Sequence, residues 1–242
     1  AAPETPPSTP PVGSALATAD AETRQAWGRK VALKAGLSLK DPRLNKIGVR
    51  TGVGPDFFVG ENRWTEGGHY NPTTGEIVVY TGVGDEPALT GLVAHEVQHA
   101  KFVRAMARYT ADHARMNEWA ATQPTRGPDS PFFSAASDLL KPEHKAKFPV
   151  FSAYRDALGD DGRGHDNWDK LKKSGSKVSP YAKSYWDAWS KGSGSTSSAV
   201  DETLAEIARL DFLGIKGTVP SVWRKFYRGI VGIYEDAEGW DG

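Results

Sequence analysis

The chain has 242 residues, with 30 basic and 30 acidic side chains, six histidines and no cysteine. A formal net charge of zero gives no electrostatic reason to expect a nucleic acid as partner, and no apolar run approaches the roughly 20 residues that cross a membrane. The lack of cysteine excludes thiol catalysis, thiolate metal ligands and disulfide bonds. Histidine and carboxylate side chains are therefore the metal ligands that remain.

The N-terminal segment, residues 1–22, is rich in proline, threonine and alanine. Such a segment buries too little apolar surface to fold alone, so we expect a flexible tail or a tether. The chain starts at Ala1 without a methionine or a leader-like apolar segment. This start favours a processed protein that is secreted or delivered outside the producing cell.

The first third of the chain predicts one helix followed by short strands. Residues 21–35 have a helical pattern that ends near Gly36. Apolar pieces between glycine and proline breaks predict strands at 46–53, 56–59 and 76–80. We expect these strands to form a small mixed sheet.

A long helix is predicted directly after the last strand. Asp85 is a good N-cap, and Pro87 fits the first turn, where its missing N–H costs nothing. From residue 88 to 123 the apolar period is helical, and no proline interrupts it before Pro124. The simplest interpretation is one helix of about 35 residues.

The rest of the chain predicts further helices. Helices are expected at 141–158, 181–189, 198–213 and 219–240, and a flexible loop rich in glycine and serine is expected at 191–198. The predicted fold is therefore α+β, with a small mixed sheet packed on the long helix and a mainly helical C-terminal half.

His95 and His99 stand at i and i+4 of the long helix, so both imidazoles lie on one face and can bind one metal ion. Glu96 lies beside them, in the place of a general base, and the pattern His-Glu-x-x-His is typical of zinc hydrolases. The alternative is a solvated helix face. It is disfavoured because the neighbouring residues are apolar, and polar groups in a buried helix need partners. These neighbours are Leu89, Leu92, Val93, Ala94 and Val97.

A catalytic zinc also needs a third protein ligand. The metzincin pattern would place a histidine where the chain has Ala105. Glu118, in Asn-Glu-Trp-Ala, has a spacing from His99 that is similar to the signature of thermolysin-like gluzincins. In an unbroken helix, however, Glu118 lies roughly 28 Å from His99 along the axis, and His113 fails for the same reason. Glu118 could bind only if the chain turned back after His99.

A second helix offers better candidates, Glu202 and Glu206, which stand one turn apart. The alternative is a solvent-facing acidic pair. Here the sequence resembles zincin metallopeptidases whose third ligand is glutamate, in particular the lethal-factor-like branch. The resemblance covers the strand at 76–80, the motif helix and the helix around Glu202. It implies that Glu202 is the third ligand, with His95 and His99, and that Glu206 orients a histidine by accepting its second ring N–H. Glu118 and Glu206 remain alternatives to Glu202.

The resemblance would also place an oxyanion-stabilising tyrosine where this chain has Ser195. The sequence therefore does not assign the oxyanion-stabilising residue. Tyr181, Tyr185 and His165 are candidates by residue type alone.

The resemblance implies a zinc-dependent endopeptidase in which Glu96 acts as general base on a zinc-bound water. In zincins the strand before the motif helix is a sheet edge that pairs with extended substrate, which gives residues 77–80 that role and makes a protein or peptide the expected partner. We expect a monomer with one zincin-like domain, residues 23–242. Helices inserted at about 124–198 would then set specificity.

Other functions remain open. A zinc amidase acting on cell-wall peptides would use the same chemistry, and a non-enzymatic zinc-containing binding or structural module would bind metal without turnover. The acidic segment at 159–169 could form a calcium loop, although it lacks the ligand register and terminal glutamate of an EF-hand.

Overall fold

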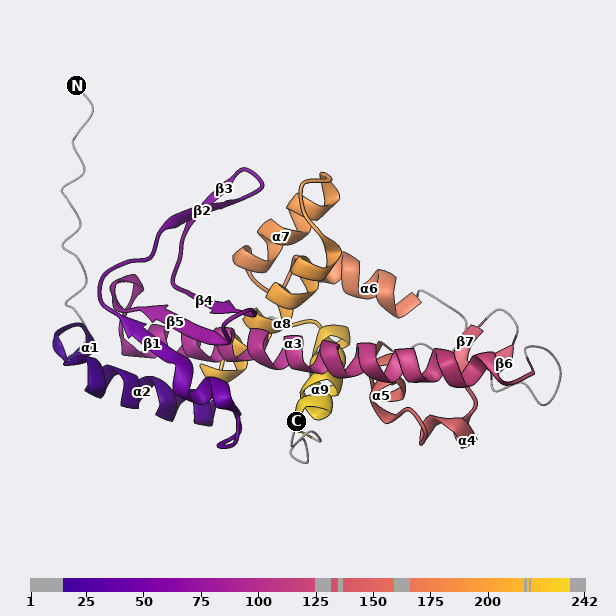
Figure 1. The fold of residues 1–242 in the computed structure, drawn as a ribbon. Helices are drawn as coiled ribbons and strands as arrows, with labels where there is room; N and C mark the ends of the chain where they lie inside the picture. Colours follow the sequence, from indigo (N-terminus) through magenta and orange to yellow (C-terminus); the bar gives the residue numbers. More distant parts are fainter. Residues whose placement is uncertain are drawn as a thin grey trace, which may run out of the picture.

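The computed structural model describes residues 15–124, 132–134, 137–158, 166–215, 217 and 219–235. The fold is α+β, mostly helical, with a small mixed sheet at the N-terminal end of the long helix α3 (Figure 1). In chain order the elements of the described residues are α1 (Ala15–Thr18), α2 (Ala21–Lys34), the 3-10 helix η1 (Pro42–Lys46), β1 (Ile47–Arg50), β2 (Asp56–Val59), β3 (Asn62–Thr65), β4 (Gly68–Asn71), β5 (Glu76–Tyr80), the 3-10 helix η2 (Thr81–Val83), α3 (Glu86–Ala121), β6 (Phe132–Ser134), β7 (Ser137–Leu140), α4 (Pro142–Lys145), α5 (Pro149–Leu158), α6 (Asp166–Gly175), α7 (Pro180–Ser190), α8 (Thr196–Phe212) and α9 (Ser221–Glu235).

The described part of the expected tail is helical. Residues 15–22 contain α1 and the start of α2, and Leu16 is buried. Asp20 caps α2 by accepting the N–H of Thr23 at 2.7 Å. The expectation of a flexible tail therefore does not hold for residues 15–22. Residues 1–14 lie outside the described residues.

The main sheet has the strand order β1–β5–β4, with β1 parallel and β4 antiparallel to β5. The prediction that residues 77–80 form the sheet edge is therefore wrong. The chain forms β4 and returns through a tight turn at 72–75, which places β5 in the centre and leaves β4 with an unpaired side among the described residues. The predicted strand at 56–59 exists as β2, but it pairs with β3 in a separate hairpin.

Helix α3 confirms the prediction of one long, uninterrupted helix. The Asp85 side chain accepts the N–H of Ala88 at 3.0 Å, and Pro87 lies in the first turn. The N-terminal half packs under the sheet, where Val93 and Val97 join one buried cluster with strand residues that include Ile77. The rest of α3 extends past the sheet (Figure 1), and the whole helix contacts α5, α8 and α9.

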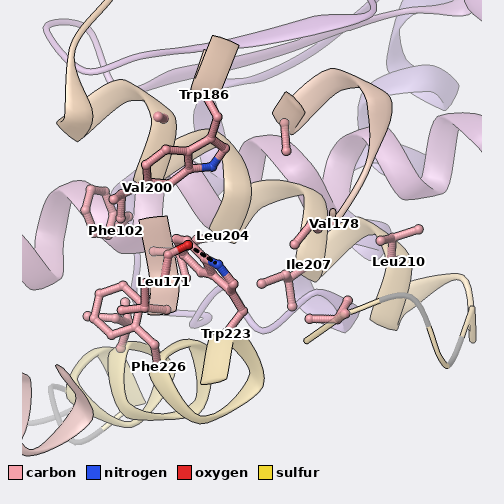
Figure 2. Packing of buried hydrophobic residues seen from close by; sticks show 14 of the residues in the cluster. Phe102, Leu171, Val178, Trp186, Val200, Leu204, Ile207, Leu210, Trp223 and Phe226 are labelled. Carbon is pink, nitrogen blue, oxygen red and sulfur yellow. Dashed lines mark hydrogen bonds between the residues drawn. The ribbon is translucent and has the colours of Figure 1, made fainter. Parts of the chain in front are cut away.

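Helix α8 lies in the centre of the helical half. Figure 2 shows Leu204 and Ile207 of α8 among the buried residues of the larger hydrophobic cluster. Polar atoms there are paired, since the indole N–H of Trp223 donates to the Leu171 carbonyl at 3.0 Å. Among the described elements, α8 has its most extensive contact with α3. This packing fixes the position of α8 against the motif.

Two predicted elements differ in extent. The helix expected at 141–158 is two helices, α4 and α5, because Pro149 has no N–H to continue the first one. The loop expected at 191–198 is shorter, because the Ser195 hydroxyl accepts the N–H of Ser198 at 3.0 Å and so starts α8 early.

The last helix is described as far as Glu235, and residues 236–242 lie outside the described residues. None of the helices in the described ranges combines the length and the apolar character that a membrane span requires.

Candidate metal centre

Helices α3 and α8 bring together His95, His99 and Glu202. The two histidine Nε2 atoms are 3.1 Å apart. Glu202 Oε2 lies 3.3 Å from the Nε2 of His95 and 3.5 Å from that of His99. Three potential ligand atoms from two helices thus form a nearly equilateral triangle.

This triangle has the size that a tetrahedral zinc site requires. With zinc–ligand bonds of about 2.05 Å, the distance between two ligands of a regular tetrahedron is about 3.3 Å. Glu202 Oε2 is also buried, and it forms no well-aligned hydrogen bond within the described ranges. A cation bound by the three atoms would satisfy this oxygen, so the residues fit a zinc ion with a fourth position left for water.

Each histidine has a carboxylate at its other ring nitrogen. Glu206 Oε1 is 3.1 Å from His95 Nδ1, and Asp201 Oδ1 is 2.9 Å from His99 Nδ1. The hydrogen bond to Glu206 places the His95 ring proton on Nδ1 and leaves the Nε2 lone pair toward the metal position, whereas the Asp201–His99 contact is an ion-pair contact without well-aligned hydrogen-bond geometry. Arg209 holds Glu206 in turn through two hydrogen bonds of 2.8 and 2.9 Å.

The close crossing of α3 and α8 depends on Gly91. A Cβ atom at this position would lie 2.9 Å from Leu213 Cδ1 and 3.1 Å from Arg209 Cγ. Glycine therefore lets α8 approach α3 one turn before the motif. Arg209, which holds Glu206, packs at this same contact.

The charges of the site perturb the pKa values of its groups in the metal-free protein. Burial alone would lower the pKa of His95, but contacts with the carboxylates of Glu202 and Glu206 raise it to about 9. The pKa of His99 also rises, because the charges of Asp201 and Glu202 outweigh burial. The pKa of Glu202 is lowered because the two histidines outweigh burial, and that of Glu206 is lowered to about 2 because His95 and Arg209 outweigh burial.

Glu96 lies beside the triangle and faces the edge of the sheet. Its side chain is buried, and burial raises its pKa even though the neighbouring histidines act in the opposite direction. A Cβ atom on Gly68 of β4 would lie 3.2 Å from Glu96 Cγ. Glycine at this position lets the edge strand lie against the Glu96 side chain.

Two of the three candidate oxyanion residues lie at the site. The Tyr181 ring centroid is 5.8 Å from that of His95, and the hydroxyls of Tyr181 and Tyr185 are 3.2 Å apart. Burial and the negative charge of Glu202 raise the pKa of both tyrosines, so both hydroxyls keep their protons and can donate hydrogen bonds. His165 lies outside the described residues, as do residues 159–165 of the proposed calcium loop.

Glu118 and His113 do not belong to this group. Both lie farther along α3, which continues without a break from the motif to Ala121. The His113 ring stacks on Phe151, with the ring centroids 5.3 Å apart. The chain does not turn back after His99, as the thermolysin-like alternative would require.

The sequence interpretation did not find the roles of Asp201 and Arg209. Asp201 directly precedes Glu202, and Arg209 stands at i+3 from Glu206. Both spacings are visible in the sequence, but only the crossing of α3 and α8 brings these residues to the site. The chain matches no protein-family model, no curated protein and no solved structure, so the site is interpreted from its own geometry.

Proposed function

We propose that the protein is a zinc-dependent hydrolase of peptide bonds, with His95, His99 and Glu202 as metal ligands. The observation that carries the proposal is the triangle of two Nε2 atoms and one carboxylate oxygen with edges of 3.1–3.5 Å. Two neutral imidazoles and one carboxylate are a usual ligand set of catalytic zinc, and they leave a position for water.

Zinc in this position would lower the pKa of its water and polarise the substrate carbonyl. Glu96 is the residue that would take the proton from this water and carry it to the leaving amine. Its buried position and raised pKa suit a group that holds a proton for part of the cycle. Tyr181 and Tyr185 offer hydroxyl donors for the negative charge that develops on the carbonyl oxygen.

The free side of β4 supports a peptide substrate. Its backbone N–H and C=O groups are available for pairing among the described residues, and Gly68 places the strand against Glu96. An extended peptide that adds to this edge would be bound by backbone hydrogen bonds close to the proposed base. In this proposal β4 replaces residues 77–80 as the substrate-binding strand.

Two alternative functions would use the same three metal ligands. A zinc amidase would cleave cell-wall peptides and leave proteins intact, and a non-enzymatic module would bind zinc without turnover. We prefer the hydrolase because Glu96 and the two tyrosines surround the ligand triangle, whereas a structural zinc site usually has four protein ligands.

The Glu96→Gln variant tests the proposal. We expect turnover of fluorescein-labelled casein to fall at least 100-fold while the zinc content stays at that of the wild type, because the amide keeps the shape but cannot accept the proton. Glu118→Gln, on the same helix but outside the site, is the matched control. Retained activity in Glu96→Gln would contradict the role of Glu96, and cleavage of peptidoglycan fragments alone would favour the amidase.

A further inference from the structure

Arg43 of η1 connects the proposed substrate-binding strand, β4, to the motif helix α3. Its guanidinium nitrogen Nη1 donates to the Ala100 carbonyl at 2.5 Å and to the Tyr70 hydroxyl at 3.3 Å. Ala100 directly follows His99 on α3, and Tyr70 belongs to β4. This nitrogen carries two N–H groups, so both hydrogen bonds form at once. A single side chain therefore joins the strand to the helix.

The aliphatic part of Arg43 also packs against the turn between β4 and β5. A Cβ atom on Gly75 would lie 3.1 Å from Arg43 Cγ. The N–H of Gly75 closes this turn by donating to the Asn71 carbonyl at 2.7 Å. Asn71 is the last residue of β4, where it pairs with Glu76 of β5. Arg43 thus contacts both β4 and the turn that connects it to β5.

Asp41 holds the Arg43 guanidinium in place. Its side chain, which is 0% exposed, accepts from Arg43 Nε at 2.9 Å and from Nη2 at 2.6 Å. It also accepts from the hydroxyl of Tyr234 on α9 at 3.1 Å. A bidentate pair between a guanidinium and a carboxylate is strong and directional, and burial keeps away the water that would weaken it. The pair with Asp41 therefore fixes Arg43 Nη1 between β4 and α3.

The contact of Arg43 with Tyr70 lies close to the proposed base. Side chains alternate along a strand, so Gly68 and Tyr70 lie on the same face of β4. On that face Gly68 lies against Glu96, and Tyr70 packs on the buried cluster that includes Val97 of α3. Among the described strands β4 has only β5 as a neighbour, so the sheet supports it from one side. The distance between β4 and Glu96 therefore depends on the link through Arg43.

We propose that Arg43 is a positioning residue that keeps β4 at the distance from α3 at which a peptide paired with the free edge of β4 lies beside Glu96. The inference rests on the proposed peptidase function. It makes Asp41 and Tyr70 partners of Arg43 that do not themselves touch the substrate. A displacement of about 1 Å in an active site can reduce the rate about 100-fold, so even a small movement of β4 has a measurable effect.

The Arg43→Lys variant tests this role. It keeps a positive charge beside Asp41, but one ammonium group cannot reproduce the geometry in which the guanidinium bonds Asp41, Tyr70 and Ala100. With fluorescein-labelled casein we expect kcat/KM to fall about ten-fold, as loss of a hydrogen bond from a charged group implies. Zinc content should be unchanged. The affinity for acetohydroxamate, measured by calorimetry, should stay within about two-fold, because this metal-binding molecule is too short to pair with β4.

Tyr70→Phe removes only the hydroxyl that Arg43 bonds, and it also serves if Arg43→Lys does not fold. We expect its kcat/KM for casein to fall by a smaller factor, about three-fold. The double variant should be no worse than Arg43→Lys alone, because the Tyr70 hydroxyl acts through Arg43. Arg50→Lys is the matched control and should behave as the wild type, since Arg50 forms an exposed ion pair with Glu76 at 3.0 Å.

Three results would overturn the inference, and they differ in what they leave standing. An unchanged kcat/KM in Arg43→Lys and Tyr70→Phe would remove the role of Arg43 while leaving the hydrolase in place. Equal losses of casein cleavage and of acetohydroxamate affinity in Arg43→Lys would mean that Arg43 supports the fold as a whole. A zinc-loaded wild type that binds acetohydroxamate but does not cleave casein would overturn the proposed function, and the inference with it.

Discussion

Glu206 lies outside the ligand triangle but should control the zinc affinity of the site. Its carboxylate is buried, accepts from His95 Nδ1 at 3.1 Å and forms two hydrogen bonds with Arg209. Glu206→Gln keeps the size of the side chain but removes the charge. His95 then loses its charged acceptor, and Arg209 loses its partner.

The magnitude follows from the loss of one charge-assisted hydrogen bond to the ligand. Such a bond contributes about 1.5–3 kcal/mol, which corresponds to about 10- to 150-fold in a binding constant. Orienting carboxylates of zinc-bound histidines typically account for about 10- to 100-fold in metal affinity. Asp201 Oδ1 lies 2.9 Å from His99 Nδ1 without a well-aligned hydrogen bond, and its side chain is 26% exposed, against 4% for Glu206. Water can replace the Asp201 carboxylate more easily, so Asp201→Asn should reduce the zinc affinity less than Glu206→Gln does.

The assay is competition for zinc between the protein and a chromophoric chelator at fixed pH. We expect the zinc Kd to rise about 10- to 100-fold in Glu206→Gln and by a smaller factor in Asp201→Asn. Asp211→Asn is the control, because Asp211 is on the same helix and forms an ion pair with Arg224 at 3.0 Å. A zinc Kd for Glu206→Gln within two-fold of the wild type, in a folded protein, would refute the reasoning.

Two more predictions concern stability. In the metal-free protein His95 has a pKa of about 9 against an ordinary 6.5, so its stabilisation is complete below about pH 6.5 and is lost as the pH rises through about 9. Glu206, with a pKa of about 2, contributes stability above about pH 4.5 that is lost as the pH falls through about 2. Calorimetry with a chelator should therefore show a falling Tm between pH 6.5 and 9, and a flat Tm there would contradict the charged cluster. Leu204→Ala should lower the free energy of unfolding by about 2–5 kcal/mol in denaturant titrations, because Leu204 is fully buried, and a loss below about 1 kcal/mol would contradict the packing of α8.

Local signals in the sequence were sufficient for the long helix and for the motif. Asp85 and Pro87 marked the start of α3, and the absence of glycine or proline after His99 excluded a turn back toward Glu118. The resemblance to zincins then indicated Glu202 rather than Glu206 as the third ligand, and the structure places Glu202 beside both histidines. The long helix and the exclusion of Glu118 could be predicted because they depend on residues close together in the chain.

The sheet order depends on contacts that the sequence does not specify. Strand β4, Gly-His-Tyr-Asn, has no apolar run, and it becomes a strand because it pairs with β5. The same pairing moved residues 77–80 from the expected edge to the centre. Asp201 and Arg209 reach the site only through the packing of α8 against α3.

The most direct test of the central claim is the zinc content of the wild type beside Glu202→Ala and Glu118→Ala, purified identically and checked for folding. We expect one zinc ion per chain in the wild type and in Glu118→Ala, and loss of zinc in Glu202→Ala. A wild type without zinc, or a Glu202→Ala variant that retains it, would contradict the ligand set on which the proposed function rests.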